Sequence, residues 1–415
     1  MNKVLIVVNL GDASPRIPGL AKYLAEFGWE SFILTPPMEE KFSSPPSGFK
    51  VVETIGYKRT DVRYYARDHF ESRKPYRKIK PFLKFFYRRF SEIRHYPDRQ
   101  KDWVPFALKS ARDLLASQTI DALLTSSPPA IAHIVARQLK EEHRIPWVAD
   151  FRDLWTQNHN YPYSRFRKFF EKKLELKTLS TADALVAVSK PMADKLTMLH
   201  GEKQVFTITN GFDPEKMGAT EVDLTLKFTI TYTGQIYKKQ NTEKLLVALR
   251  DLISEGTLDR NDVEVRIFGP ANEELKKQAE RFGLAGVVVQ YGTVSREVCF
   301  QRQKESQLLW QITWEDPVEK GAYSGKIFEY LGAHRNILAT GGFGGDVVEE
   351  LIKETNSGFY CSNVEDVKTA LRKLYSEYKA KGFVLYHGDL EKIDKYSYRE
   401  MAKRFADILE DLKCS

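Results

Sequence analysis

The feature that most limits how this chain can fold is an alternation of short apolar strands with amphipathic helices, which occurs in two consecutive runs. The first run opens at residues 3–9 (KVLIVVN), a β-branched apolar segment typical of a buried parallel strand. The second run opens near residue 227. Parallel strands joined by helices form doubly wound sheets, and 415 residues are too many for one typical core. The sequence therefore predicts two α/β domains, joined around residues 210–225.

The periodicity of the apolar residues places the expected elements. In the first domain, strands are expected at 3–9, 31–34, 120–124, 146–149, 184–188 and 205–208, and helices at 19–27, 103–116, 130–142 and 191–199. In the second domain, strands are expected at 228–232, 264–268, 287–291, 308–312 and 336–339, and helices at 241–255, 272–282, 296–305 and 326–333. A last helix is expected at 398–412. These elements predict domains at 1–209 and 210–395, with residues 396–415 packing back on the first domain.

The composition is that of a globular protein with one basic region. Hydrophobic residues make up 42% of the chain and charged residues 29%. Residues 71–101 hold eleven Lys or Arg against three Asp or Glu, and they carry the whole net charge of +8. No apolar run reaches the roughly 20 residues of a membrane span, and the run at residues 4–8 is too short for a signal peptide. Because only three cysteines occur, without metal-like spacing, the sequence predicts a cytoplasmic protein.

The basic region also carries aromatic residues, within a predicted insertion at about 62–101. The apolar side chains that can gather on one side of a helix there are Phe82, Phe85, Phe86, Phe90 and Ile93. A basic helix of this kind can lie on an anionic membrane, so residues 71–96 predict a peripheral attachment to the inner face of the membrane. The alternative is an insertion whose aromatic side chains pack on the first domain. Nucleic acid is disfavoured as a partner, because no nucleic-acid fold signature accompanies the patch.

Ligands of doubly wound sheets bind beyond the carboxyl ends of the strands. In this chain those positions are rich in Gly and small polar residues, which let a ligand approach the backbone. The dinucleotide signature G-x-G-x-x-G does not follow the first strand, and the P-loop signature G-x-x-x-x-G-K-[ST] is missing. A nicotinamide dehydrogenase and a P-loop enzyme are therefore disfavoured. Residues 341–345 (GGFGG) follow a strand and precede a helix, so they form either a turn or a phosphate-binding loop.

Four sequence blocks, in order along nearly the whole chain, resemble blocks of the retaining glycosyltransferases of the GT-B fold, family four type. They are 146–155 (PWVADFRDLW), similar to the DFRDxW block of a polysaccharide-building subgroup; 208–213 (ITNGFD), similar to the NGxD interdomain turn; 232–237 (YTGQIY), similar to the donor-phosphate loop; and 324–331 (SGKIFEYL), similar to the K-hydrophobic-x-E-Y-L block. The resemblance implies a GT-B fold of two Rossmann-like domains facing a central cleft. The first domain would bind the acceptor and the second a nucleotide-sugar.

The resemblance also implies roles for individual residues. A nucleotide-sugar leaves as a diphosphate, and Lys326 at a helix start would supply a cation beside backbone N–H groups. Glu329 would accept hydrogen bonds from the ribose hydroxyls. The residues predicted to bind the donor are Gly11, Gly234, Gln235, Lys238, Lys239, Ser324, Gly325, Lys326 and Glu329. The predicted catalytic residues are Asp150, Arg152, Asp153 and Glu319.

Structural alternatives stay open for these residues. Lys326 and Glu329 lie three residues apart and could form an exposed pair on one helix face. Asp150 and Asp153 flank Arg152, and this carboxylate–arginine network could brace its loop instead of orienting the acceptor hydroxyl or the donor sugar.

Three positions depart from the family pattern. Gln235 stands where an Arg commonly follows the glycine, so one phosphate contact must come from elsewhere, with Lys239 as the candidate. Arg152 stands where many members carry a His. The usual position of a first glutamate falls on Gly321, and Glu319, two residues earlier, would have to take that role.

The sequence thus predicts an enzyme that moves a sugar from a UDP- or GDP-linked donor to a lipid-linked or saccharide acceptor with retention, in cell-surface polysaccharide synthesis. No cofactor and no metal are expected, because lysines and a helix N-terminus can replace the cation. Two alternatives stay open: a nucleotide-sugar epimerase of the same fold, and a non-catalytic nucleotide-sugar-binding subunit. The basic aromatic segment argues against the epimerase, which acts on the donor without a membrane acceptor.

Overall fold

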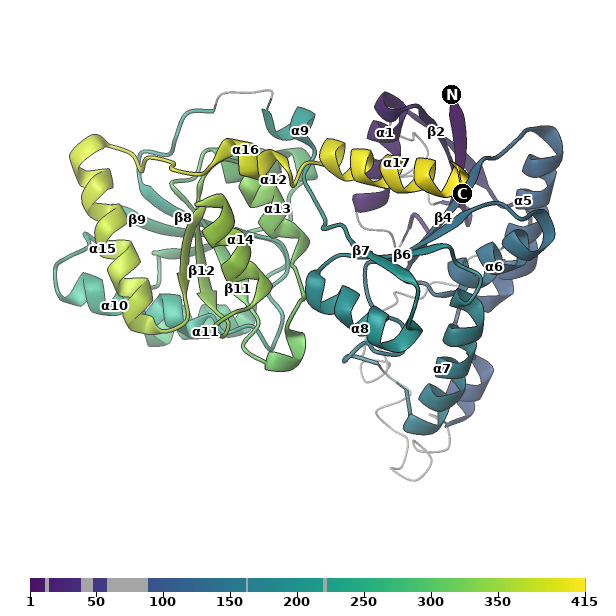
Figure 1. Ribbon diagram of the computed structural model, residues 1–415. Coiled ribbons are helices and arrows are strands. Elements are labelled where there is room, and N and C mark those ends of the chain that lie inside the picture. The colour runs from purple at the N-terminus through teal and green to yellow at the C-terminus, as the bar shows by residue number, and fades with distance from the viewer. Residues whose placement is uncertain (12–14, 39–47, 58–88, 162, 219–221, 415) are drawn as a thin grey trace. The chain divides into compact units, whose positions relative to one another are not determined.

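The chain forms two units in the computed structural model, which describes residues 1–11, 15–38, 48–57, 89–161, 163–218 and 222–414 (Figure 1). The N-terminal unit consists of Met1–Thr209 and Met401–Ser415, and the C-terminal unit consists of Asn210–Glu400. Much of the predicted basic insertion at about 62–101, and of the predicted membrane segment at 71–96, falls outside the described residues, which resume at Arg89.

Seven parallel strands form the sheet of the N-terminal unit. They are β1 (Asn2–Val7), β2 (Trp29–Thr35), β3 (Phe49–Glu53), β4 (Ala122–Ser127), β5 (Trp147–Phe151), β6 (Ala184–Ala187) and β7 (Gln204–Thr207). Their order in the sheet is β3-β2-β1-β4-β5-β6-β7. At the centre, Val4 of β1 lies between Ser31 of β2 and Ala122 of β4. Every residue of β4, β5 and β6 is buried, as expected for strands covered by helices on both faces.

The helices of this unit connect the strands and cover the sheet. They are α1 (Arg16–Leu24), α5 (Val104–Ser117), α6 (Ile131–His143), α7 (Arg165–Leu179), α8 (Lys190–His200) and, from the end of the chain, α17 (Tyr398–Cys414). Nowhere in the described part of the chain is a helix long and apolar enough to cross a membrane.

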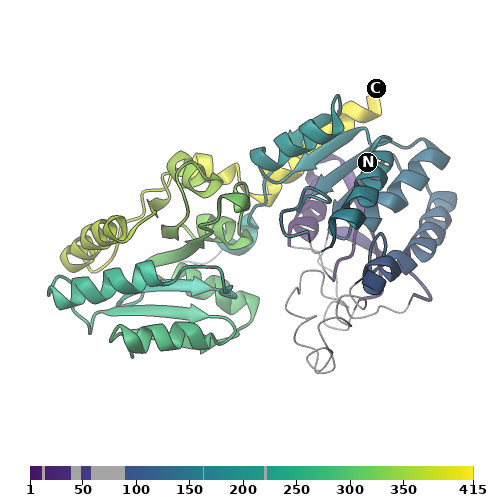
Figure 2. The ribbon, with the colours of Figure 1, turned by 90° about the horizontal axis from the view of Figure 1, so that it is seen from below.

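Six parallel strands form the sheet of the C-terminal unit, with helices on both of its sides (Figure 2). The strands are β8 (Phe228–Thr233), β9 (Val263–Phe268), β10 (Val288–Gly292), β11 (Leu308–Thr313), β12 (Asn336–Gly341) and β13 (Gly358–Cys361). The helices are α9 (Pro214–Gly218), α10 (Glu243–Ser254), α11 (Glu273–Arg281), α12 (Arg296–Lys304), α13 (Gly325–Gly332), α14 (Val347–Thr355), α15 (Val364–Lys381) and α16 (Leu390–Asp394). The strand order is β10-β9-β8-β11-β12-β13.

Both sheets follow the Rossmann order, in which the strand order reverses beside the first strand. The reversal lies between β1 and β4 in one unit and between β8 and β11 in the other. The predicted fold class, two doubly wound parallel α/β sheets, is confirmed. Six of these helices and strands are not among the predicted ones: β3, α7, α9, β13, α15 and α16. The edge strand β3 has no buried residue, so the hydrophobic pattern that identifies the central strands is weak there.

Arg16, the first residue of α1, is completely buried and connects four parts of the N-terminal unit. Its guanidinium donates to both carboxylate oxygens of Asp150 in β5, at 2.8 and 3.2 Å. Its remaining partners are the carbonyl oxygens of Ile208 and Thr209, the sulfur of Met401 and the ring of Phe405. Because the last two lie on α17, this one cation joins the C-terminal helix to α1, to β5 and to the segment that leaves the unit.

The C-terminal end of α17 contacts residues at and near the start of the chain, so that the two termini lie side by side (Figure 1). Asn2 donates a hydrogen bond to Glu410 at 3.0 Å. Lys413 forms an ion pair with Asp121 at 3.4 Å. These exposed contacts add little energy each, so the buried apolar face of α17, where Met401 and Phe405 lie against Arg16, is the stronger anchor of the helix.

Replacing Arg16 by Ala should destabilise the N-terminal unit strongly. The substitution leaves the Asp150 carboxylate buried without its charge partner, and such losses cost about 3–5 kcal/mol. Urea unfolding followed by tryptophan fluorescence measures the effect. The matched control is Arg137→Ala, because Arg137 pairs with Glu141 at 2.8 Å near the surface, where loss of the pair should cost less than about 1 kcal/mol. Similar losses in the two variants would contradict the role given to Arg16.

Candidate functional site

Lys326 and Gly234, two of the predicted donor-binding residues, lie close together where β8 ends and α13 begins. Lys326, the second residue of α13, donates a hydrogen bond from Nζ to the Tyr232 hydroxyl at 2.9 Å. Its Nζ also lies 4.6 Å from the centroid of the Tyr232 ring. The Tyr232 hydroxyl in turn donates to the carbonyl oxygen of Gln235 at 2.8 Å. The cation is therefore held against the loop that follows β8, at the point where the strand order reverses.

Gly234 allows this close approach. Its φ of +107° is one that other residues rarely adopt, and a Cβ there would lie 3.2 Å from Cε and 3.4 Å from Nζ of Lys326. The next loop also approaches closely, since a Cβ on Gly269 would lie 2.2 Å from the Gly234 carbonyl oxygen. Backbone without side chains next to a cation is the arrangement that a phosphate group needs.

Burial lowers the pKa of Lys326 to about 8, while the nearby charge of Glu329 acts in the opposite direction. The side chain is therefore mostly protonated at neutral pH. An ammonium group has three donors, and the contact with Tyr232 uses one of them. A charged, partly desolvated group with remaining donors can form short, charge-assisted hydrogen bonds to an anionic ligand.

Glu329 is positioned by residues of α12. Its carboxylate forms an ion pair with Arg296 and accepts a hydrogen bond from Gln303 at 3.3 Å. Gln303 is fully buried and also donates to the Thr233 hydroxyl, at 2.9 Å, in β8. Glu329 and Lys326 therefore have separate partners. Among the residues that it describes, the structure does not show the exposed ion pair between them that was the alternative from the sequence. Sequence patterns do not single out Arg296 and Gln303, because they lie on α12, outside the four resembling blocks.

The other predicted donor-binding residues have more open surroundings. Gln235, Lys238 and Lys239 are exposed in the loop and turn after β8. Ser324 is the N-cap residue of α13 and Gly325 is its first residue, so both lie at the positive end of that helix. In the N-terminal unit, the backbone N–H of Gly11 donates to the side chain of Asn9 at 3.0 Å. Their contacts with a donor remain predictions.

Glu319 is almost fully buried at the end of the short 3-10 turn Pro317–Glu319. The Asp316 side chain caps this turn by accepting a hydrogen bond from the N–H of Val318 at 3.0 Å. The nearby Glu315 forms an ion pair with Lys244 at 2.7 Å. The catalytic role of Glu319 stays a prediction, and a substrate would have to reach a side chain with little exposed surface.

Asp150 forms a buried network with an arginine, as one alternative from the sequence foresaw, but the arginine is Arg16 rather than Arg152. Its carboxylate also accepts a hydrogen bond from the Ser126 hydroxyl at 2.8 Å. Arg152 instead donates to Ser126 at 3.1 Å and to the carbonyl oxygen of Pro128. Because Asp150 has no exposed side-chain surface, it can influence a substrate only through the residues that it holds.

Asp153 lines a pocket of the N-terminal unit that is open to solvent and contains about 620 Å³ of empty space. The lining combines aromatic rings with hydrogen-bonding and charged groups. Its polar and aromatic members are Asp98, Arg99, Ser127, Asp153, Trp155, Asn158, Asn160, Tyr161, Tyr163 and Glu171. Ser127 ends β4, and Asp153 and Trp155 follow β5, so the pocket lies at the carboxyl edge of the sheet. Asp153 is the residue of this lining that the sequence predicts to be catalytic. Most of the other lining residues do not directly follow a strand, so the expectation that ligands bind beyond the strand ends does not point to them.

Residues 341–345 form a turn before α14. The Asp346 side chain caps this helix by accepting hydrogen bonds from the N–H groups of Val348 and Glu349, both at 2.9 Å. The Tyr360 hydroxyl donates to Asp346 at 2.6 Å, and a Cβ on Gly342 would lie 1.9 Å from that hydroxyl. A carboxylate already occupies the N-terminal end of α14, which favours the turn over a phosphate-binding loop.

Comparison with known proteins agrees with this architecture. Residues 17–216 match the family model described as Glycosyltransferase Family 4. Sucrose-phosphate synthase from Thermosynechococcus elongatus has a TM-score of 0.66 at 11% identity, with 100% of both chains covered. Anabaena HepE, solved in complex with UDP and glucose, has a TM-score of 0.64 at 12% identity, covering 99% of this chain and 100% of that one. The lipopolysaccharide outer core galactosyltransferase WaaB has a TM-score of 0.57 at 13% identity, with 99% of both chains covered.

The fold is GT-B. Likeness at this low identity shows the GT-B fold and not a substrate. Together with the family match over the first half of the chain, it supports a sugar-transferring glycosyltransferase. No curated protein matches the chain.

Replacing Lys326 by Met should weaken binding of a nucleoside diphosphate. The change keeps most of the side-chain volume and removes the charge, and the loss of a charge-assisted contact costs about 1.5–3 kcal/mol. Titration calorimetry with UDP and GDP measures it. Lys353→Met serves as the control, because Lys353 is an exposed lysine of α14. Unchanged affinity in a folded Lys326→Met protein would rule out this lysine as a phosphate contact.

The lowered pKa of Lys326 also predicts a pH dependence of binding. The ammonium is charged below a pH of about 8 and neutral above it, and a diphosphate prefers the charged form. Affinity should therefore fall as the pH rises from about 7 to 9, and Lys326→Met should remove most of that slope. A parent protein whose affinity stays constant across this range would contradict the assignment.

Proposed function

We propose that this protein transfers a sugar from a UDP- or GDP-linked donor to a lipid-linked or saccharide acceptor, with retention of the anomeric configuration, in the synthesis of a cell-surface polysaccharide. The observation that carries the proposal is the position of Lys326. Its ammonium lies against the Gly234 backbone, where β8 ends and α13 begins.

The chemistry of the leaving group explains why this position matters. As the glycosidic bond to the donor phosphate breaks, negative charge builds up on the diphosphate, and fixed positive charge there lowers the barrier. Lys326 supplies such a charge, and the N-terminal end of α13 adds the partial positive charge of its backbone N–H groups. Glu329, which is held by Arg296 and Gln303, lies three residues farther along the same helix and would accept hydrogen bonds from the ribose hydroxyls.

The pocket of the N-terminal unit is the candidate acceptor site. Its rings, among them Trp155 and Tyr163, offer flat apolar surface, while Asp153, Asn158 and Asn160 offer hydrogen-bonding groups. A sugar presents both an apolar ring face and hydroxyl groups, so this lining suits a saccharide. The HepE neighbour, solved with UDP and glucose, supports a nucleotide-linked glucose or a related sugar as the donor.

Incubation of the purified protein with a panel of nucleotide-sugars tests the proposal. Release of the nucleoside diphosphate, with a new glycoside when saccharide or lipid-linked acceptors are added, is the expected result. Proton NMR of the product then gives the anomeric configuration. Formation of an epimer of the donor would instead identify an epimerase, and binding without turnover would identify a non-catalytic subunit.

Transfer should continue after divalent metal ions are removed. In the proposed site, Lys326 and the start of α13 stabilise the diphosphate, so a metal ion is not needed for that purpose. Activity measured after treatment with EDTA should stay close to that of the untreated protein. Complete loss of activity that returns with Mg²⁺ or Mn²⁺ would show that a metal ion carries this step.

A further inference from the structure

The N-terminal unit presents a cluster of aromatic side chains that the proposed chemistry does not use. Phe166, Phe169 and Phe170 of α7 expose 75%, 55% and 44% of their surface. The rings touch each other, with centroids of Phe170 and Phe166 4.9 Å apart and those of Phe170 and Phe169 5.5 Å apart. Three neighbouring phenylalanines in water are costly for a folded monomer, and such patches mark contact surfaces.

The exposed charged side chains that α7 carries near these rings are all basic. The basic side chains Arg165, Lys172 and Lys173 are exposed, while both acidic residues of α7 are buried. Lys173 lies with its Nζ 4.5 Å from the centroid of the Phe169 ring, so cations and rings share one area. We call the area formed by Arg165, Phe166, Phe169, Phe170, Lys172 and Lys173 the α7 surface.

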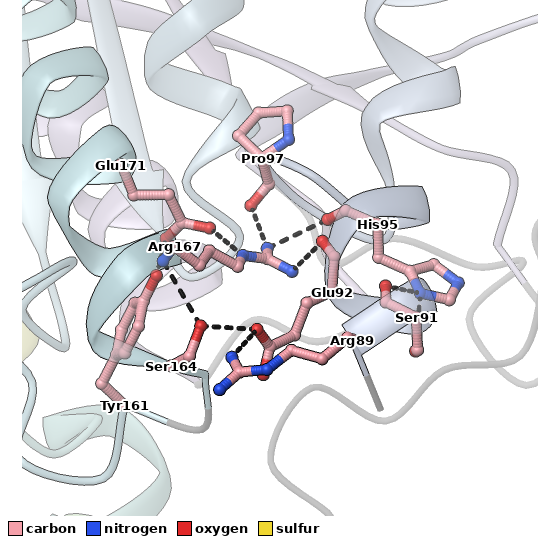
Figure 3. Close-up of polar contacts among 9 residues, drawn as sticks. All are labelled: Arg89, Ser91, Glu92, His95, Pro97, Tyr161, Ser164, Arg167 and Glu171. Atoms are coloured by element: carbon pink, nitrogen blue, oxygen red, sulfur yellow. Dashed lines mark hydrogen bonds and ion pairs between the residues drawn. The ribbon is translucent and has the colours of Figure 1, made fainter. Parts of the chain in front are cut away.

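The orientation of α7 is fixed by an arginine on its opposite, buried face (Figure 3). Arg167 forms a buried ion pair with Glu171. Its guanidinium also donates to the carbonyl oxygens of Glu92, His95 and Pro97, at 2.8–3.0 Å. Because these polar contacts can form only when Arg167 points inward, the phenylalanines of α7 are held outward.

The segment that Arg167 binds extends the same kind of surface. Residues 89–94 are helical, and Ser164 at the start of α7 donates a hydrogen bond to the Glu92 carboxylate at 2.6 Å. Phe90 and Ile93 of this segment are exposed, as is Arg94. Two helical segments joined by buried polar contacts therefore both present apolar and basic side chains to the outside.

We propose that the α7 surface, with Phe90 and Ile93 beside it, binds the surface of an anionic lipid membrane. Exposed rings can enter the headgroup region while lysines and arginines bind lipid phosphates and carboxylates. A second copy of the chain fits less well, since a symmetric contact would bring the same positive charges together. The proposal rests on described residues of α7 and does not depend on the chemistry of sugar transfer, so it can fail or succeed separately from the proposed function.

Flotation of the full-length protein with lipid vesicles tests the proposal. We expect binding to vesicles of phosphatidylcholine mixed with phosphatidylglycerol, weak binding to phosphatidylcholine alone, and release as salt is added. The double variant K172E/K173E should lose at least about tenfold in vesicle affinity. Its control is K276E/K277E, which makes the same change in net charge at two adjacent exposed lysines of α11 and should bind like the parent.

A second pair of variants tests the rings. F166S/F169S should also reduce vesicle binding about tenfold or more, since it removes two large apolar side chains from the contact. The control M198S removes an apolar side chain of α8 that is 85% exposed, and it should have no effect. Thermal melting of each variant checks that the fold is kept, which the exposure of all these side chains favours.

Three results would overturn the proposal. The first is a parent protein that does not bind anionic vesicles. The second is binding that survives both α7 variants, which would place the membrane contact elsewhere in the chain, for instance in residues 58–88. The third is a parent that sediments as a dimer while F166S/F169S sediments as a monomer, because the α7 surface would then join two copies of the chain.

Discussion

The buried guanidinium of Arg16 is the contact on which the integrity of the N-terminal unit depends. A charge without exposed surface is stable only when it is paired and its donors are satisfied. Here the satisfying groups come from β5, from the 208–209 backbone and from α17, so the cation can be buried only if the C-terminal helix is in place. This requirement explains why a unit built from the first 209 residues also includes the last turns of the chain. It also means that the carboxylate of Asp150 is used to pair with Arg16 and is not available to contact a substrate directly.

Lys326 shows what happens when a half-buried cation is not fully satisfied. Arg16 uses its donors on a carboxylate and on backbone carbonyls, whereas Lys326 makes one hydrogen bond to a tyrosine hydroxyl and faces an aromatic ring. Burial without a carboxylate partner is also why its pKa falls to about 8. Arg16 is thus saturated by its neighbours, and the candidate functional cation Lys326 is left with donors to spare. The two cations therefore differ in saturation as well as in burial, since Arg16 is fully buried and Lys326 is half-buried.

Much of the fold could be predicted from the sequence, because central parallel strands are continuous apolar runs and their helices have clear periodicity. Lys326, Gly234 and Glu329 could be placed in one area because ligands of such sheets meet the carboxyl ends of the strands. The residues that orient Glu329 could not be predicted in this way. Gln303 and Arg296 lie on a helix between two other strands, and their contact with Glu329 exists only once β8 and β11 are neighbours in the sheet. Likewise, nothing in the local sequence pairs Asp150 with Arg16, which lies 134 positions away.

The helix α7 could not be found from hydrophobic periodicity because its polarity is reversed. Its buried face carries Arg167, Glu171 and Glu175, and its phenylalanines face outward. The reversal is stable because the guanidinium of Arg167 replaces apolar packing with an ion pair and hydrogen bonds to three backbone carbonyls. Such a helix gains less from burying apolar surface than an ordinary amphipathic helix does, and it keeps three rings in water. A surface arrangement with that cost is most simply explained by a partner that removes the rings from water, and the exposed basic side chains of α7 beside the rings fit the anionic partner proposed above.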